Sequence, residues 1–140
     1  MTRLIVLFFA LLSVCCGCSC DSPSPTQKKL FCSADYVATY TMFKDVGNST
    51  HLLYVGVAED IFKSDGFIQS GSHIRIITSS EGSACGVSWL EDQKKYLLNG
   101  NRCIRGLCVN SCGQMAKTEW KNVSADLKQS LEDGVFEPCK

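Results

Sequence analysis

The stretch Cys18-Ser19-Cys20 carries the residues with the clearest chemical potential in this chain. It follows directly on a segment that has the features of a secretory signal, so removal of that segment would make Cys18 the first residue. A free α-amine and the carbonyl oxygen of the same residue form a five-membered chelate for a metal ion. A disulfide at Cys18 would hold both atoms still. These residues therefore predict a metal-directed N-terminus that the remaining chain must position.

Residues 1–17 have the parts of a signal peptide: a basic Arg3, an apolar run and then small residues ending at Gly17. The apolar run is too short to span a bilayer, which takes roughly 20 residues. A membrane anchor and a lipoprotein signal are the alternatives, and no good lipobox precedes the cysteines. Cleavage after Gly17 releases Cys18, whereas a cut one residue earlier would leave Gly17 in front. We expect a secreted, extracellular protein whose single domain spans residues 18–140.

Removal of residues 1–17 takes away one cation, Arg3, and no acid. Thirteen Lys and Arg then face fourteen Asp and Glu, a net charge of −1. Such a balance argues against a nucleic-acid partner and against strong electrostatic membrane binding. We expect a monomer that binds neither nucleic acid nor membranes.

Eight cysteines remain after residue 17, an even count that indicates a disulfide framework in a small secreted chain. Spacing alone leaves 105 pairings open. Without further information, Cys18 and Cys20 could be ordinary framework cysteines. The eight are Cys18, Cys20, Cys32, Cys85, Cys103, Cys108, Cys112 and Cys139.

Runs of β-branched and aromatic residues predict five short strands with turns between them. Ser24 before Pro25 predicts a short helix over residues 25–31, and Ser124 is expected to cap a helix over residues 125–132 that Gly134 ends. Asn99-Gly100-Asn101 is a strong turn signal. Five strands flanked by two helices favour a closed Greek-key β-barrel of the OB-fold type, although a β-sandwich fits the strand count almost as well. The predicted strands cover residues 34–43, 52–62, 73–78, 96–98 and 104–109.

Other chemical patterns are sparse. His51 and His73 are far apart and do not have metal-ligand spacing, so no intrinsic metal site or cofactor is expected. No phosphate-binding glycine loop or nucleophile elbow occurs, so the sequence gives little support to an enzyme. Two sequons, at Asn48 and Asn122, predict surface positions for N-linked sugar.

With these residues in view, the chain resembles the N-terminal, netrin-like domain of the tissue inhibitors of metalloproteinases over essentially all of residues 18–140. The resemblance begins with Cys18-Ser19-Cys20 at the cleavage point, and ordered matches along the chain make it specific. The further matches are Phe31-Cys32-Ser33-Ala34-Asp35-Tyr36-Val37, 54–63, Ile74-Arg75-Ile76, Ser83-Ala84-Cys85-Gly86, Tyr96-Leu97-Leu98-Asn99-Gly100, and Trp120 with Ser124.

The resemblance implies the pairs Cys18–Cys85, Cys20–Cys112 and Cys32–Cys139. Cys103 and Cys108 are left over, and their spacing suits a staple across a hairpin. It also implies a mechanism, in which the α-amine and carbonyl of Cys18 bind the catalytic zinc of a matrix-type metalloproteinase. The residues expected at that interface are Cys18, Ser19, Cys20, Asp21, Ser22, Ser83 and Ala84.

Three departures from the family pattern bear on this expectation. The sequence ends at Lys140, so the family's second, C-terminal domain is expected to be absent. Asp21 stands where a small or apolar residue is usual, and Ala84 is smaller than the usual valine-like residue, while the first hairpin is short. The alternative function is therefore a non-inhibitory netrin-like module that acts on a receptor, an immune-cell surface or the extracellular matrix.

Overall fold

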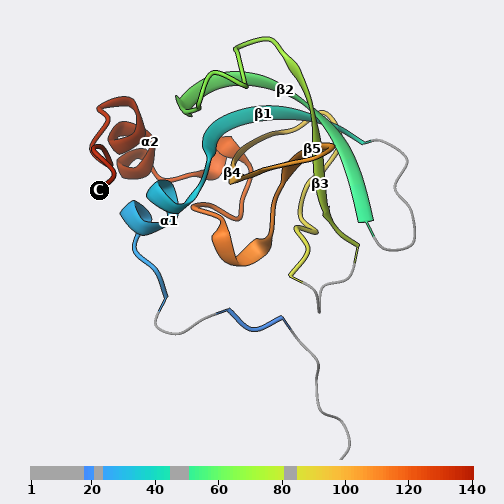
Figure 1. Cartoon of the computed structure of the whole chain (residues 1–140), viewed down its shortest axis with the longest axis horizontal. Coiled ribbons are helices and arrows are strands. Elements are labelled where there is room, and N and C mark those ends of the chain that lie inside the picture. The colour runs from blue at the N-terminus through green and yellow to red at the C-terminus, as the bar shows by residue number, and fades with distance from the viewer. Residues whose placement is uncertain (1–17, 21–23, 45–50, 81–84) are drawn as a thin grey trace, which may run out of the picture.

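A computed structural model describes residues 18–20, 24–44, 51–80 and 85–140. Within these ranges the chain forms a closed barrel of five strands with two helices packed against one end (Figure 1). None of the helices that the structure describes has the length and apolar character needed to cross a bilayer. The elements are α1 (Gln27–Ser33), β1 (Tyr36–Lys44), β2 (His51–Lys63), β3 (His73–Ser79), β4 (Lys95–Cys103), β5 (Gly106–Cys108), η2 (Ser111–Gly113), η3 (Trp120–Asn122) and α2 (Ala125–Glu132).

The strands close in the order β1-β2-β3-β5-β4, with β4 returning to pair with β1. All pairs are antiparallel except β3 and β5, which run parallel and share only the positions Ile76↔Leu107 and Ile77↔Cys108. The predicted mainly-β, five-stranded closed barrel is confirmed, and the β-sandwich alternative is wrong. Closure removes most of the unpaired edge that a sandwich would expose.

β1 is buried on both of its faces, which links the barrel interior to the helical layer. Tyr36, Tyr40 and Met42 point into the barrel, whereas Val37 belongs to a second cluster with Phe31. This second cluster lies between β1, β4 and the two helices, and α2 contributes Leu131 to it. A strand with apolar residues on successive positions thus serves two cores at once.

Both helices begin at a capping hydroxyl. The Ser124 side chain accepts a hydrogen bond from Leu127 N at 3.2 Å, as the sequence predicted, and Gly134 follows α2 with φ +66°. The start of α1 was predicted wrongly: Thr26, not Ser24, caps it, by accepting from Lys29 N at 3.2 Å. The helix therefore lies two residues further along than expected.

The predicted turn at Asn99-Gly100-Asn101 is wrong, because these residues lie inside β4. The chain turns instead at Ile104 and Arg105, so β5 is shorter than the predicted strand 104–109. Glycine is required at position 100 for a different reason. A Cβ there would lie 2.3 Å from the carbonyl oxygen of Cys108 and 2.6 Å from the Tyr36 hydroxyl oxygen.

Lys63, at the end of β2, joins the barrel to the C-terminal end of α1. Its ammonium donates hydrogen bonds to the carbonyl oxygens of Phe31 at 3.1 Å, Cys32 at 3.0 Å and Ala34 at 2.6 Å. Carbonyls at the end of a helix have no partner within the helix, and a cation there is favourable. One side chain thus satisfies three carbonyls near the helix end.

Candidate functional site

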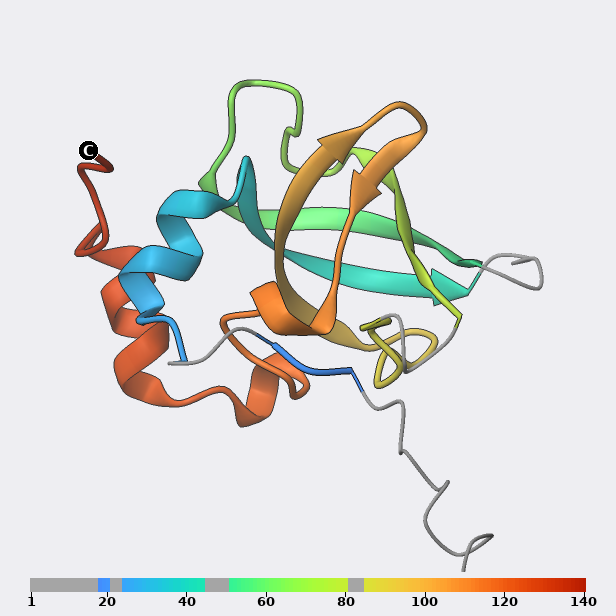
Figure 2. The same ribbon diagram turned by 60° about the horizontal axis from the view of Figure 1, so that its bottom comes forward.

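The stretch Cys18–Cys20, the blue segment that passes below the barrel in Figure 2, is anchored at both ends by disulfides. Cys18 is bonded to Cys85, which follows β3, and Cys20 is bonded to Cys112 in η2. The Cα–Cα distances across these bonds are 5.0 and 5.4 Å. Ser19, between the two anchors, is exposed. The main chain of all three residues is therefore held against the barrel while the central side chain faces solvent.

The two anchoring disulfides contact each other. The Sγ atom of Cys112 lies 3.6 Å from the Sγ of Cys18 and 3.6 Å from the Sγ of Cys85. The sulfurs of Cys18, Cys20 and Cys112 all lie within 4.8 Å of one another, a spacing that free thiolates could use to hold a metal ion. Each of these sulfurs is bonded in a disulfide, so none is available as a thiolate ligand. Any metal chemistry at this stretch must therefore come from its backbone atoms or from the Ser19 hydroxyl.

Hydrogen bonds tie the two anchor points to each other and to the strands. Ser111 N donates to the carbonyl of Cys85 at 2.8 Å, which connects the segment after β3 with η2. Val109 N donates to the carbonyl of Ile77 at 3.0 Å, and the Asn110 side chain caps η2 by accepting from Gly113 N at 2.9 Å. Cys85 adopts a left-handed conformation with φ 58°. The disulfide partners of the N-terminal stretch are thus fixed by the barrel itself.

A buried amide pair holds the segment after η2 on β4. Gln114 Nε2 donates to the carbonyl of Asn99 at 2.7 Å and to that of Asn110 at 2.9 Å, while its Oε1 accepts from Asn99 N at 3.2 Å. The Asn99 side chain in turn accepts from Met115 N at 2.8 Å and donates to the carbonyl of Gly113. Sequence reasoning missed this support, because Asn99 before glycine has the composition of a turn. A polar residue directly after the apolar run of β4 was the only available signal.

The structure does not describe the other predicted interface residues. Asp21, Ser22, Ser83 and Ala84 lie outside the described residues, as does the sequon asparagine Asn48. The second sequon asparagine, Asn122, is exposed in η3, and its occupancy stays a prediction. Beside Cys20, a hollow of about 290 Å³ opens between α1 and η2, with walls from Pro25, Leu30 and Gly113 among others.

The remaining disulfides serve the scaffold. Cys32 in α1 is bonded to Cys139, and Cys103 is bonded to Cys108 across the β4–β5 turn. All four bonds join the same pairs that the resemblance and the hairpin spacing implied. Cys32–Cys139 fixes α1 to the segment that follows α2, close to the contact between the Phe31 and Phe136 rings, whose centroids are 5.5 Å apart.

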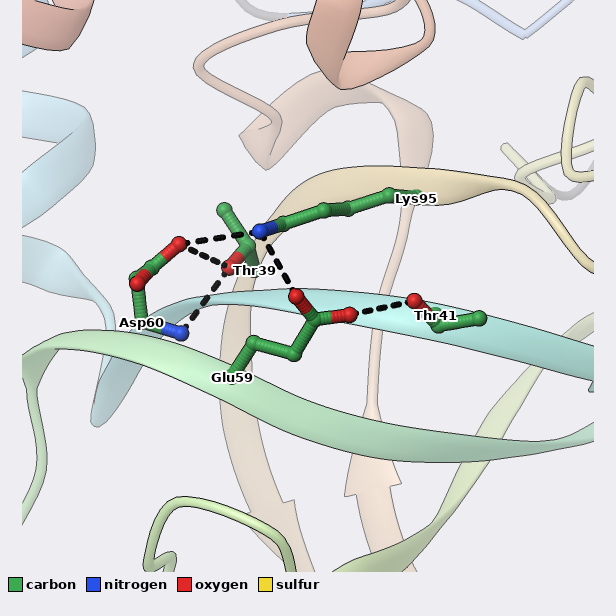
Figure 3. A network of polar contacts seen from close by, with 5 residues as sticks. All are labelled: Thr39, Thr41, Glu59, Asp60 and Lys95. Atoms are coloured by element: carbon green, nitrogen blue, oxygen red, sulfur yellow. Dashed lines mark hydrogen bonds and ion pairs between the residues drawn. The ribbon is translucent and has the colours of Figure 1, made fainter.

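A dense group of charged and hydroxyl side chains joins β1, β2 and β4 (Figure 3). The Lys95 ammonium donates to Glu59 at 2.8 Å and to Asp60 at 3.0 Å, and Thr39 donates to Asp60 at 3.1 Å. Thr41 donates to the other oxygen of Glu59.

This group is built for cross-strand pairing and not for acid–base catalysis. The hydrogen bond from Lys95 is the main cause that lowers the pKa of Glu59 and of Asp60. Desolvation lowers the pKa of Lys95, but the hydrogen bonds to both carboxylates outweigh it, so that pKa is raised. General acid or base work needs a pKa near the working pH, and all three groups are shifted away from it.

A closed five-stranded barrel with two adjoining disulfides that anchor an extended N-terminal stretch defines a netrin-like domain of the disulfide-stabilised class. The family model described as tissue inhibitor of metalloproteinase matches residues 16–140, and the chain belongs to this family. A search of curated proteins finds no match. Members of the family are secreted inhibitors of metalloproteinases and are not enzymes.

Proposed function

We propose that the protein inhibits zinc metalloproteinases by placing the α-amine and carbonyl oxygen of Cys18 on the catalytic zinc of the target. The observation that carries this proposal is the double anchoring of the Cys18–Cys20 stretch, in a chain of this family. Catalytic zinc keeps one coordination position open for water or substrate, and a bidentate N,O ligand can occupy it. Displacement of the zinc-bound water removes the nucleophile of the target enzyme.

The anchors explain how so small a ligand could bind tightly. A free N-terminal dipeptide would lose conformational freedom on binding, whereas a stretch fixed at Cys18 and Cys20 has already lost it during folding. Ser19, which is exposed between the anchors, is proposed to enter the specificity pocket beside the zinc. Asp21, Ser22, Ser83 and Ala84 are proposed to line the same contact on either side of Cys18. The carboxylate of Asp21 is proposed to narrow the range of targets.

The mechanism requires that residues 1–17 are removed as a signal peptide. In the uncut chain the nitrogen of Cys18 is an amide and cannot ligate zinc. After cleavage it is an α-amine with an ordinary pKa near 7.7–8.0, and only the neutral form binds metal. At pH 7 most of this amine is protonated, so ligation must release its proton, at a cost of about 1 kcal/mol, and inhibition is expected to weaken as the pH falls below the pKa of the amine.

The decisive experiment is a one-residue extension. The secreted protein should start at Cys18 when its N-terminus is sequenced, and it should inhibit a matrix-type zinc proteinase. Insertion of one alanine before Cys18 should abolish inhibition, because the chelating amine becomes an amide and the added residue occupies the zinc site. An alanine added after Lys140 is the matched control and should leave inhibition unchanged.

Each outcome of the extension experiment has a defined interpretation. Circular dichroism and a thiol titration show whether the extended protein keeps its fold and its four disulfides. Equal inhibition with and without the extension would refute chelation by Cys18. A folded, correctly processed protein that inhibits no zinc proteinase would refute the inhibitor proposal and leave the non-inhibitory binding module.

A further inference from the structure

All of the chain's arginines after Arg3 surround one hollow in the surface, although they come from two separate parts of the sequence. Arg75 lies on β3, Arg102 near the end of β4, and Arg105 in the β4–β5 turn. The hollow has a volume of about 320 Å³ and is also lined by Phe67, His73 and Ile104. The other cations of residues 18–140 are lysines. Arginine differs from lysine in offering a planar fork that fits a carboxylate with two hydrogen bonds.

The walls of the hollow are held in place by the fold. The Cys103–Cys108 disulfide closes the β4–β5 turn, and Gly106 passes so close to β3 that a Cβ would lie 2.2 Å from the carbonyl oxygen of Arg75. The Arg102 guanidinium, also in the lining, lies over the Phe67 ring, 3.9 Å from its centroid. The backbone of the β4–β5 turn and the Arg102 side chain therefore do not have to be organised by a ligand.

Positive charge in the hollow is only partly neutralised within the molecule. Arg102 has an ion pair with Asp65 at 3.9 Å, and both side chains remain more than half exposed. No salt bridge to Arg75 or Arg105 occurs among the described residues, and both are exposed. Among the described residues, Arg75 and Arg105 thus have no carboxylate within ion-pair distance.

The hollow also has exposed apolar side chains and a strand edge beside it. Ile104 at the apex of the turn is fully exposed, with a relative exposure of 104%, and Phe67 is 41% exposed. In addition, β5 pairs with β3 only from Ile76 onward, so the preceding edge at His73 and Ile74 has no strand beside it on this side among the described residues. An extended peptide can lie along such an edge, with alternate side chains directed to opposite sides.

We propose that this hollow binds an extended, acidic segment of a partner protein in which carboxylate and apolar side chains alternate. The carboxylates would pair with Arg75 and Arg105, and the apolar side chains would cover Ile104 and Phe67. A sulfated polysaccharide would match the arginines but leaves Ile104 without a role, and a flat anionic membrane does not reach into a hollow.

The β4–β5 turn, which borders the hollow, lies at the other end of β3 from the stretch Cys18–Cys20 (Figure 2). His73 begins this strand, whereas Cys85 follows its last residue, Ser79. Seven residues of strand span roughly 20 Å, so the two surfaces do not overlap. Peptide binding is therefore independent of the proposed zinc chelation, and a partner held here would leave the terminus free.

The test uses the folded, secreted protein and a fluorescein-labelled peptide of sequence Val-Glu-Val-Asp-Val-Glu, at low salt. Arg75→Gln and Arg105→Gln should each weaken binding about tenfold, which corresponds to about 1.4 kcal/mol. Lys117→Gln, which removes an exposed cation elsewhere, is the matched control and should have no effect. The peptide with Gln and Asn in place of its acids should not bind, and Ile104→Ser should weaken binding severalfold. Metalloproteinase inhibition should be unchanged in every variant.

Three results would overturn the proposal. The first is no saturable peptide binding, or peptide binding that the arginine changes leave intact. The second is arginine-dependent binding of heparin without binding of the peptide, which would assign the hollow to a polysaccharide. The third is arginine-dependent binding of phosphatidylserine vesicles without binding of the peptide, which would assign it to a membrane surface.

Discussion

Replacement of Lys63 by methionine is expected to destabilise the protein by removing the donor at the end of α1. Methionine keeps most of the aliphatic length of the lysine side chain, so packing changes little. The three carbonyls of Phe31, Cys32 and Ala34 lose their shared charged donor. Two of these residues, Phe31 and Ala34, are buried, which limits replacement by water.

The size of the effect follows from these contacts. A hydrogen bond to a charged group contributes about 1.5–3 kcal/mol, and three bonds from one ammonium are not additive. We therefore expect Lys63→Met to lower the free energy of unfolding by about 3 kcal/mol. For a domain of this size that loss lowers the Tm by roughly 10 °C.

The assay is denaturant unfolding of the disulfide-bonded protein, with hydrogen exchange of the α1 amides as a local readout. Lys117→Met, at an exposed lysine, is the matched control and should change stability by less than about 0.5 kcal/mol. Exchange in α1 should accelerate in Lys63→Met even though Cys32–Cys139 still holds the helix. If Lys63→Met is as stable as the control, the ammonium does not stabilise the helix end and the reasoning fails.

Two further predictions concern the barrel. The lowered pKa values of Glu59 and Asp60 mean that their pairing with Lys95 stabilises the fold above the unfolded-state values of 4.5 and 3.8 and loses this effect as the pH falls through the lower folded-state values. At neutral pH, Lys95→Met should be less stable than the wild type by at most about 1 kcal/mol, because both carboxylates are well exposed. Chemical denaturation at about pH 3 should show a smaller difference between the two proteins. Gly100→Ala should cost several kcal/mol because its Cβ would meet the Cys108 carbonyl at 2.3 Å, whereas Gly113→Ala, with its nearest contact at 3.5 Å, should cost much less. Similar thermal unfolding of the two alanine variants would contradict the close approach at Gly100.

The sequence predicted the barrel well because its strands carry strong local patterns. β-branched and aromatic runs mark β1, β2 and β3 whatever their neighbours do, and Ser124 and Gly134 delimit α2 locally. Asn99 and Gly100 were misread because the same two residues form a tight turn in one setting and a crowded strand crossing in another. Only the contacts with Gln114 and Cys108, which follow later in the chain, distinguish the two.

Functional candidates that are adjacent in the sequence could be predicted from it, whereas candidates that only the fold brings together could not. Cys18, Ser19 and Cys20 could be recognised because adjacent residues carry the chemistry. The hollow around Arg75, Arg102 and Arg105 could not, since 27 positions separate the first two residues and the parallel β3–β5 contact that unites them has no local signature. Long-range support by single side chains, such as Lys63 beneath α1, is invisible in sequence for the same reason.

The spacing of the bonded cysteines sets an order of events during synthesis. The partners of Cys18, Cys20 and Cys32 lie 67, 92 and 107 residues downstream, whereas Cys103 and Cys108 are five residues apart. Each native bond can form only after its second cysteine has been made, which for Cys18 is Cys85 and for Cys20 is Cys112. The stretch Cys18–Cys20 is therefore anchored at both ends only after Cys112 has been made, so a shorter nascent chain lacks a rigid Cys18–Cys20 stretch.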